Sequence, residues 1–223
     1  NDDTVISKYL VDALSVSKRD LVAAAEHVER AKKLDPSFFE VHRVDALIHK
    51  WSGNQAAAWE AYENAVACEP KYAPLRYWYG GFLLRDNDDL DAAHEQFLLA
   101  REIDPESAQV QVELGRTYVF KGQFEEADEL LQPVVESSAA TIKLRRKGFD
   151  TWIQSAARRA TQCYDRGDYL GAIGALEEQI HRYNAFADDL ADSRIILTMI
   201  RQIHLPEMIL AALGEVSGAD RAR

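Results

Sequence analysis

The chain has 223 residues, of which 47% are hydrophobic, a composition typical of a folded protein. Its 26 basic and 37 acidic residues give a formal net charge of −11, which argues against binding to nucleic acid or to an anionic membrane, since each of these needs a cationic surface. The sequence also has no apolar run of about 18 residues, and its two cysteines, Cys68 and Cys163, lack the spacing of a metal motif. We therefore expect a cytoplasmic protein with no disulfide and no membrane insertion.

The apolar periodicity predicts helices along the whole chain and no strands. The predicted helices span residues 4–17, 20–34, 37–51, 55–68, 72–86, 89–103, 107–120, 123–136, 141–166, 169–183, 187–204 and 206–214. Short polar or glycine-containing turns separate the two helices of each pair. Ser37 and Glu40 have the spacing of a capping box, which predicts that the third helix starts at Ser37. About 12 helices in antiparallel pairs are expected.

A repeat runs through the first part of the chain. Acidic residue–proline pairs end at Pro36, Pro70 and Pro105, which are 34 and then 35 residues apart. Counting back from each proline, position −5 is alanine, position −8 is bulky and position −12 is again alanine. A period in this range, with small and large residues in fixed register, is typical of stacked helical hairpins. Such arrays bury their core between neighbouring repeats and expose an extended binding surface.

These positions make the chain similar to the tetratricopeptide repeat family over about residues 5–136. The resemblance is carried by Gly81, Gly115 and Tyr118 in first helices, by Gly53 and Gly122 in turns, and by the alanine–bulky–alanine–proline set in second helices, whereas Ala46 stands where the family usually has glycine. It implies an all-α fold, a right-handed α-solenoid of antiparallel helical hairpins. We predict four such hairpins in residues 1–136. Residues 137–223 would add a divergent fifth hairpin with a long basic helix, and C-terminal capping helices.

The resemblance further implies a concave groove lined by the first helix of each hairpin, where a peptide or partner protein binds. Transferred by register, the groove residues are Glu40, Arg43, Leu47, Lys50, Leu75, Trp78, Tyr79, Phe82, Arg85, Gln109, Val112, Arg116 and Val119. Aromatic residues bordered by arginines are typical of binding hot spots. The sequence leaves open whether Trp78 and Phe82 face the groove or the core. The Lys/Asn clamp with which some members of the family hold a C-terminal carboxylate is missing.

A local excess of positive charge stands out from the acidic composition. It comprises Lys143, Arg145, Arg146, Lys147, Arg158 and Arg159. One interpretation is a docking patch for an acidic partner, a phosphate or nucleic acid. The other is a solvated face that pairs with acidic residues of this same protein, and the net charge of the chain favours this second interpretation.

No motif for phosphate binding, metal binding or nucleophilic catalysis occurs in the sequence. His42, Asp45 and His49 share one predicted helix, which we interpret as a polar surface, and we predict no catalytic residue, no cofactor and no metal. Two functions stay open. The first is a non-catalytic interaction scaffold, in which self-association through the ends of the array is conceivable. The second is a regulatory or sensor segment of a larger signalling protein, such as an NTPase or effector, that binds an activating ligand or its own chain. The missing initiator methionine favours a fragment of a longer protein.

Overall fold

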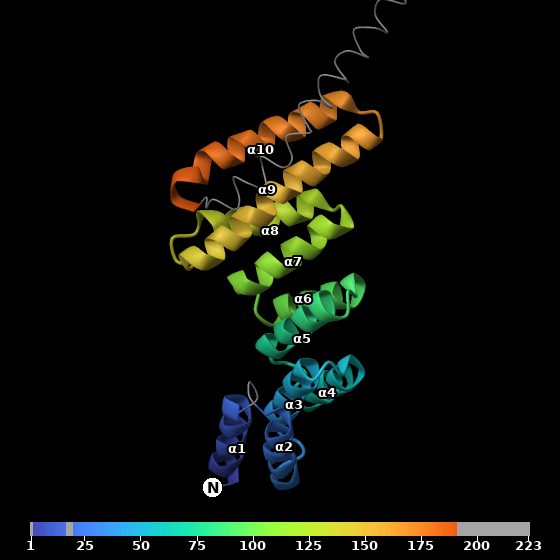
Figure 1. Ribbon diagram of the computed structural model, residues 1–223. Helices are drawn as coiled ribbons and strands as arrows, with labels where there is room; N and C mark the ends of the chain where they lie inside the picture. The colour runs from blue at the N-terminus through green and yellow to red at the C-terminus, as the bar shows by residue number, and fades with distance from the viewer. Residues whose placement is uncertain (1, 17–19, 191–223) are drawn as a thin grey trace, which may run out of the picture. The chain divides into compact units, whose positions relative to one another are not determined.

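The computed structural model describes residues 2–16 and 20–190, which form ten α-helices and no strand (Figure 1). The helices are α1 (Asp2–Val16), α2 (Leu21–Leu34), α3 (Phe39–Trp51), α4 (Gln55–Cys68), α5 (Ala73–Asp86), α6 (Leu90–Ile103), α7 (Ala108–Lys121), α8 (Phe124–Glu136), α9 (Ile142–Asp165) and α10 (Tyr169–Leu190). The all-helical prediction is confirmed for these residues. The first nine predicted helices begin and end within two residues of the observed ones.

The end of the chain differs from the prediction. Helix α10 continues to Leu190, whereas the sequence predicted an end at 183. The predicted capping helices, 187–204 and 206–214, fall almost entirely outside the described residues. The expected total of about 12 helices therefore stays a prediction.

The second helix of each of the first three pairs starts at a polar N-cap. Asp20 accepts hydrogen bonds from the backbone N–H groups of Val22 and Ala23, both at 3.0 Å. Asn54 and Asp89 make the same kind of bond at the starts of α4 and α6, at 3.2 Å and 3.0 Å. Each bond satisfies a backbone donor that has no partner inside the helix. The short polar turns of the sequence thus set where these helices begin.

The capping box predicted for α3 is wrong. Helix α3 has Phe38 as its N-cap, with no side-chain capping bond. Ser37 instead turns toward Asp35, to which its backbone N–H and its hydroxyl both donate, at 2.8 Å and 2.6 Å. The aspartate of the Asp35-Pro36 pair therefore holds the loop, and the helix starts after it.

Two glycines allow the helices of a pair to approach closely. A Cβ added at Gly80 would lie 2.9 Å from the Phe97 ring on α6, and one at Gly115 would lie 2.8 Å from Leu131 Cγ on α8. At Gly81, the glycine on which the sequence comparison relied, the three atoms nearest to the added Cβ all belong to the flexible Arg85 side chain of the same helix. The glycine of the repeat in α5 is therefore Gly80, which is 35 residues before Gly115, as Pro70 is before Pro105.

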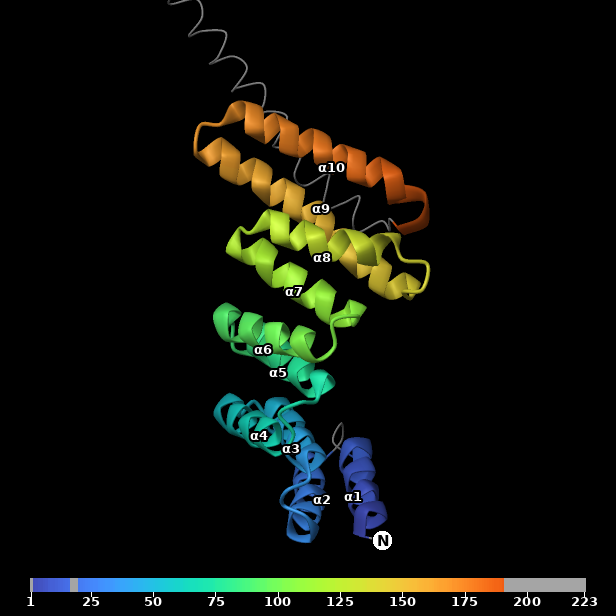
Figure 2. The same ribbon diagram turned by 180° about the vertical axis from the view of Figure 1, so that it is seen from behind.

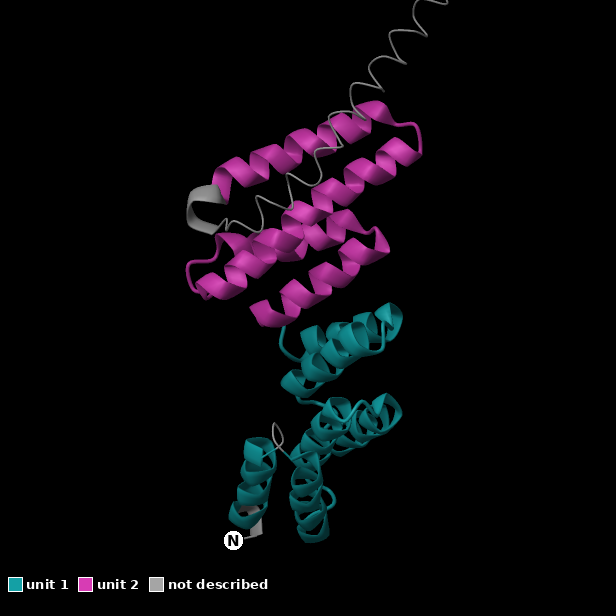
Figure 3. Ribbon diagram, in the orientation of Figure 1, with its two compact units in different colours: residues 1–105 teal, residues 106–223 magenta. Residues whose placement is uncertain are grey.

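The chain divides into two compact units, residues 1–105 (unit 1) and residues 106–223 (unit 2) (Figure 3). The sequence predicted a boundary at 136, between the regular hairpins and the divergent part, and that division stays a prediction. The long helix α9 packs against both α7 and α8, so α9 and the fourth hairpin pack together within unit 2. Within unit 2, α9 and α10 lie side by side as an antiparallel pair, which is clear from both directions of view (Figure 2).

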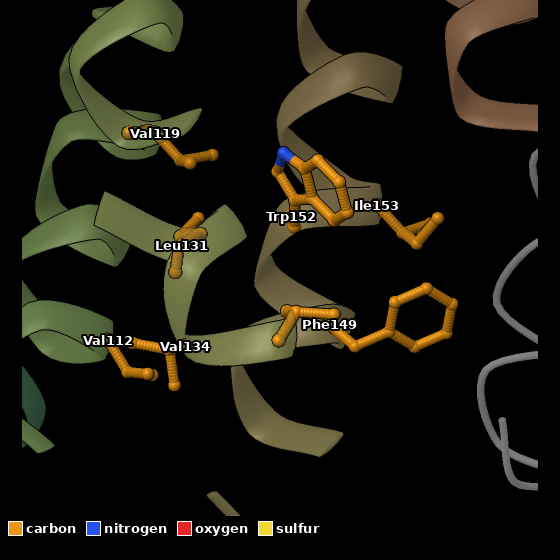
Figure 4. Packing of buried hydrophobic residues seen from close by; sticks show 9 residues of the cluster. Val112, Val119, Leu131, Val134, Phe149, Trp152 and Ile153 are labelled. Atoms are coloured by element: carbon orange, nitrogen blue, oxygen red, sulfur yellow. The ribbon is translucent and has the colours of Figure 1, made fainter. Parts of the chain in front are cut away.

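Each unit has its own hydrophobic core. In unit 1, the cluster joins α1, α2 and α3 and contains Ile6, Leu10, Ala13, Ala24, Val28, Ala31, Val41, Val44 and Ile48. In unit 2, it joins α7, α8 and α9 and contains Val112, Val119, Ala127, Leu131, Val134, Val135, Phe149, Trp152 and Ile153 (Figure 4). The small alanines of the repeat lie where helices touch, and the bulky residues fill the space between them.

Candidate functional site

The first helices of two neighbouring hairpins in unit 1, α3 and α5, are joined by side chains near their surface. The guanidinium of Arg43 on α3 lies 4.6 Å from the ring centre of Trp78 on α5. Farther along the helices, Lys50 Nζ forms an ion pair with Asp86 Oδ2 at 2.8 Å. We call the group formed by Glu40, Arg43, Lys50, Trp78 and Asp86 the α3–α5 surface. It brings together four of the predicted groove residues and adds Asp86, which the sequence analysis did not select.

Trp78 is held in place from two sides. Arg43 stacks on it and is itself bound by Glu40, whose Oε2 accepts from Arg43 Nε at 2.7 Å. The Tyr72 ring meets Trp78 edge-on, with 6.3 Å between the ring centres. Trp78 is half-buried, so part of the ring stays open to solvent. An aromatic ring that is fixed and still accessible loses little conformational entropy when a partner binds.

Three other groove residues of α5 lie in the core. Leu75, Tyr79 and Phe82 are all buried. Tyr62 of α4 stacks on Tyr79 at 5.3 Å and contacts Phe82 at 5.0 Å between ring centres. The sequence left open whether Trp78 and Phe82 face the groove or the core. In the structure, Phe82 packs between α4 and α5, whereas Trp78 is partly exposed.

The packing of these tyrosines affects their ionisation. Burial raises the pKa of Tyr62 to about 12, while the positive charge of Arg43 opposes part of this shift. Burial also raises the pKa of Tyr79, and the negative charges of Glu63 and Asp89 act in the same direction. Both hydroxyls therefore stay protonated to a higher pH than the hydroxyl of an exposed tyrosine.

The predicted groove residues of α7 divide in the same way. Val112 and Val119 belong to the core of unit 2, whereas Gln109 is exposed and Arg116 is half-buried. Leu47 on α3 is half-buried and Arg85 on α5 is exposed. A helix turns by about 100° per residue, so the family positions mark one side of each helix only approximately. Of the residues that the family positions select on one helix, some therefore lie in the core and others are exposed to solvent.

Sequence reasoning missed an exposed aromatic residue in unit 2. Phe120 on α7 is 38% exposed, which leaves its ring accessible. Its ring centre lies 5.5 Å from the guanidinium of Arg116 and 4.9 Å from that of Arg158 on α9. The signal in the sequence was the spacing of four residues between Arg116 and Phe120, which places both on one side of a helix. The approach of Arg158 could not be seen there.

The six basic residues of the predicted patch do not act together. Arg145 donates to the backbone oxygen of Val135 at 2.8 Å. Lys147 pairs with the buried carboxylate of Glu113 on α7. Lys143, Arg146 and Arg158 are exposed. Lys147 therefore pairs within the protein, as the second interpretation predicted, whereas docking of a partner on the exposed residues stays a prediction.

Arg159 belongs to a partly buried ion-pair network that joins α8, α9 and α10. It binds Asp128 Oδ2 and Glu178 Oε2, each at 2.9 Å. Arg182, which is only 3% exposed, pairs with the same two carboxylates and donates to the Trp152 backbone oxygen at 2.8 Å. The network ties the long helix α9 to α8 and α10, so both arginines are engaged within unit 2.

The histidines of α3 do not converge on a common point. His42 Nε2 contacts the backbone oxygen of Pro36 at 2.8 Å, and His49 Nε2 lies 3.6 Å from Asp45. The Asp45 carboxylate is bound by Lys32 Nζ at 2.8 Å. In the part of the chain that the structure describes, no three His, Cys, Asp or Glu side chains are grouped so that they could hold a metal ion. None of the helices described there is both long and apolar enough to span a bilayer.

Neither family models nor curated proteins match this chain, but solved structures do. PilF of Pseudomonas aeruginosa is 22% identical, with a TM-score of 0.60 over 99% of this chain and 93% of that chain. YrrB, a TPR protein with an unusual peptide-binding site, is 16% identical, with a TM-score of 0.60 over 86% of this chain and 90% of that one. A tetratricopeptide repeat protein from Parabacteroides merdae is 12% identical, with a TM-score of 0.55 over 96% and 93% of the two chains. At these identities the similarity shows a shared fold.

Proposed function

Since the chain has the tetratricopeptide repeat fold, we propose that it is a non-catalytic scaffold that binds a peptide or a partner protein on the surface of its first helices. Such arrays commonly use this extended surface to hold another chain. The similarity of the fold to YrrB, which has a peptide-binding site, is consistent with this function.

The observation that carries the proposal is the partly exposed Trp78 ring, which lies between Arg43 and Tyr72. Tryptophan, tyrosine and arginine are the residues most enriched where protein partners bind tightly. The neighbouring ion pair between Lys50 and Asp86 supplies a polar border to the aromatic centre. An aromatic centre with a polar border is the usual composition of a protein interface.

The proposal is tested by selecting binders from a random displayed peptide library with the full chain. The affinity of a selected peptide is then measured for the wild type and for Trp78→Ala. We expect the variant to bind about 30-fold more weakly, the loss typical of a hot-spot residue. Trp51→Ala is the matched control, because Trp51 is an exposed tryptophan at the end of α3, and it should bind as the wild type does.

Circular dichroism melts of both variants show whether the fold is preserved. Because Trp78 is half-buried, the variant should remain helical. If the library yields no binder, or if the selected peptides bind Trp78→Ala and the wild type equally well, the proposal is contradicted.

A further inference from the structure

In unit 2, one side of α7 faces one side of α9 across two side-chain contacts. Lys147 of α9 pairs with Glu113 of α7, and Arg158 of α9 stacks on Phe120 of α7. Residues 113, 116 and 120 are spaced by three and four positions, so they follow one face of α7. The two contacts bring this face next to the side of α9 that carries residues 147 and 158. We call Glu113, Arg116, Phe120, Lys147 and Arg158 the α7–α9 surface.

The charge of this surface is opposite to that of the chain. It has three basic residues and one acidic residue, a net charge of +2, whereas the chain has a net charge of −11. The acidic residue, Glu113, is buried and neutralised from within by Lys147 and by Arg116, whose Nη1 lies 3.8 Å from Glu113 Oε2. Lys143, one helical turn before Lys147, adds a further exposed positive charge.

Arg158 is the most available of these cations. It is exposed, and in the described part of the chain it forms neither an ion pair nor a hydrogen bond, only the contact of its guanidinium with the Phe120 ring at 4.9 Å. A guanidinium that stacks on an aromatic ring keeps the N–H groups at its edge free to donate. Those donors match the two oxygens of a carboxylate.

We propose that the α7–α9 surface binds an acidic peptide segment of a partner protein, with carboxylates received by Arg158 and Arg116 next to the exposed ring of Phe120. This inference rests on the proposed function only in that the chain binds a partner protein, and it adds a second surface, in unit 2, with its own ligand chemistry. A peptide fits better than nucleic acid, because a long phosphate backbone would be repelled by the other acidic surfaces of a chain with a net charge of −11.

The test uses fluorescence anisotropy with the full chain and a short labelled peptide of alternating glutamate and serine. A matched peptide of alternating glutamine and serine has the same length without the charge. We expect the glutamate peptide to bind, more weakly as the salt concentration rises, and the glutamine peptide not to bind. Equal binding of both peptides, or tighter binding of a single-stranded oligonucleotide of the same length, overturns the proposal.

Single substitutions then locate the binding. Arg158→Gln and Arg116→Gln should each weaken binding of the glutamate peptide about tenfold, the effect of losing a charge-assisted hydrogen bond. Arg30→Gln is the control, since Arg30 is an exposed arginine on α2 of unit 1 and its loss changes the net charge equally. If all three variants bind alike, net charge alone accounts for binding and the proposal is overturned.

The same assay separates this inference from the proposed function. Trp78→Ala changes unit 1 and should leave binding of the glutamate peptide unchanged. If the selected library peptides require Trp78 for binding but the glutamate peptide does not bind, the inference is overturned and the proposed function stands. A library without binders would overturn the proposed function itself.

Discussion

The guanidinium of Arg43 lies 4.6 Å from the ring centre of Trp78, and its positive charge also acts on the hydroxyl of Tyr62. Arg43 comes from α3, Tyr62 from α4 and Trp78 from α5. The Arg43 side chain therefore interacts with residues of the next two helices, with the partly exposed Trp78 ring by stacking and with the buried Tyr62 through its charge. Arg43 is therefore shared by the surface proposed to bind a partner and the surroundings of a buried tyrosine.

The stability of the protein should fall in alkaline solution because of Tyr62. Burial raises the pKa of this tyrosine from 10.0 to about 12, so the folded state holds its proton where the unfolded state releases it. This contribution to stability is fully present below pH 10 and is lost as the pH rises toward about 12. Urea unfolding of the wild type and of Tyr62→Phe, at several pH values on either side of 10, measures the effect. Above that pH, the variant should lose less stability per pH unit; identical slopes would contradict the assignment.

Overpacking one alanine of the repeat should destabilise the fold. Ala93 is fully buried on α6, and Ala93→Leu adds three carbon atoms to a filled contact between helices. We expect the free energy of unfolding to fall by about 1–3 kcal/mol. Ala67→Leu on α4 is the control, because Ala67 is exposed and the change there should stay within about 0.5 kcal/mol. Chemical denaturation of both variants checks the difference, and equal effects would mean that the buried position is not tightly packed.

Two glycine-to-alanine substitutions within helices should have opposite effects. At Gly174 on α10, an added Cβ would meet no atom of the described residues within 4 Å outside its own helix backbone, so Gly174→Ala should stabilise the protein by up to about 1 kcal/mol through helix propensity. At Gly80 on α5, the Cβ would lie 2.9 Å from the Phe97 ring, and Gly80→Ala should destabilise the protein. Thermal melts of the two variants, compared with the wild type, give the sign of each change. A stabilised Gly80→Ala variant would show that α5 and α6 can separate at little cost.

Removing Arg182 should destabilise unit 2 strongly. Arg182→Met keeps much of the volume of the side chain but leaves Asp128 and Glu178 without their most buried partner. We expect a loss of about 3 kcal/mol, because a partly buried charge that loses its partner is costly. Arg159→Gln should cost less, since the Arg159 side chain is 22% exposed and that of Arg182 only 4%. Urea denaturation of both variants gives the order, and the reverse order would contradict this account of the network.

The local pattern of the sequence was sufficient for the helices, because helix ends depend on nearby residues. Asp20, Asn54 and Asp89 cap helices through backbone groups two or three positions away. The capping box was predicted wrongly because Ser37 has two candidate partners, and Asp35 is the one that binds it. The sequence analysis selected Gly81 in place of Gly80 because the interval from Pro70 to Pro105 is one residue longer than the interval from Pro36 to Pro70. Gly80 is the glycine that lies close to the Phe97 ring.

The candidate site was harder to predict, because it depends on contacts between residues far apart in the chain. The sequence selected Trp78 and Arg43 together, but it also selected Leu75, Tyr79 and Phe82, which the adjacent helix buries. Which of these aromatic residues is exposed depends on the angle at which α4 packs on α5. Periodicity along a single helix carries no information about that angle.

By itself, the sequence determined that the chain folds into helical hairpins in a repeating register, since spacing, small residues at contacts and polar caps act over a few positions. Only the tertiary structure decided that the units divide at residue 105, that Phe82 is core, and that Arg158 approaches Phe120 from 38 residues away. The physical reason is that burial and charge pairing are properties of surfaces from different helices. Those surfaces exist only once the helices have packed.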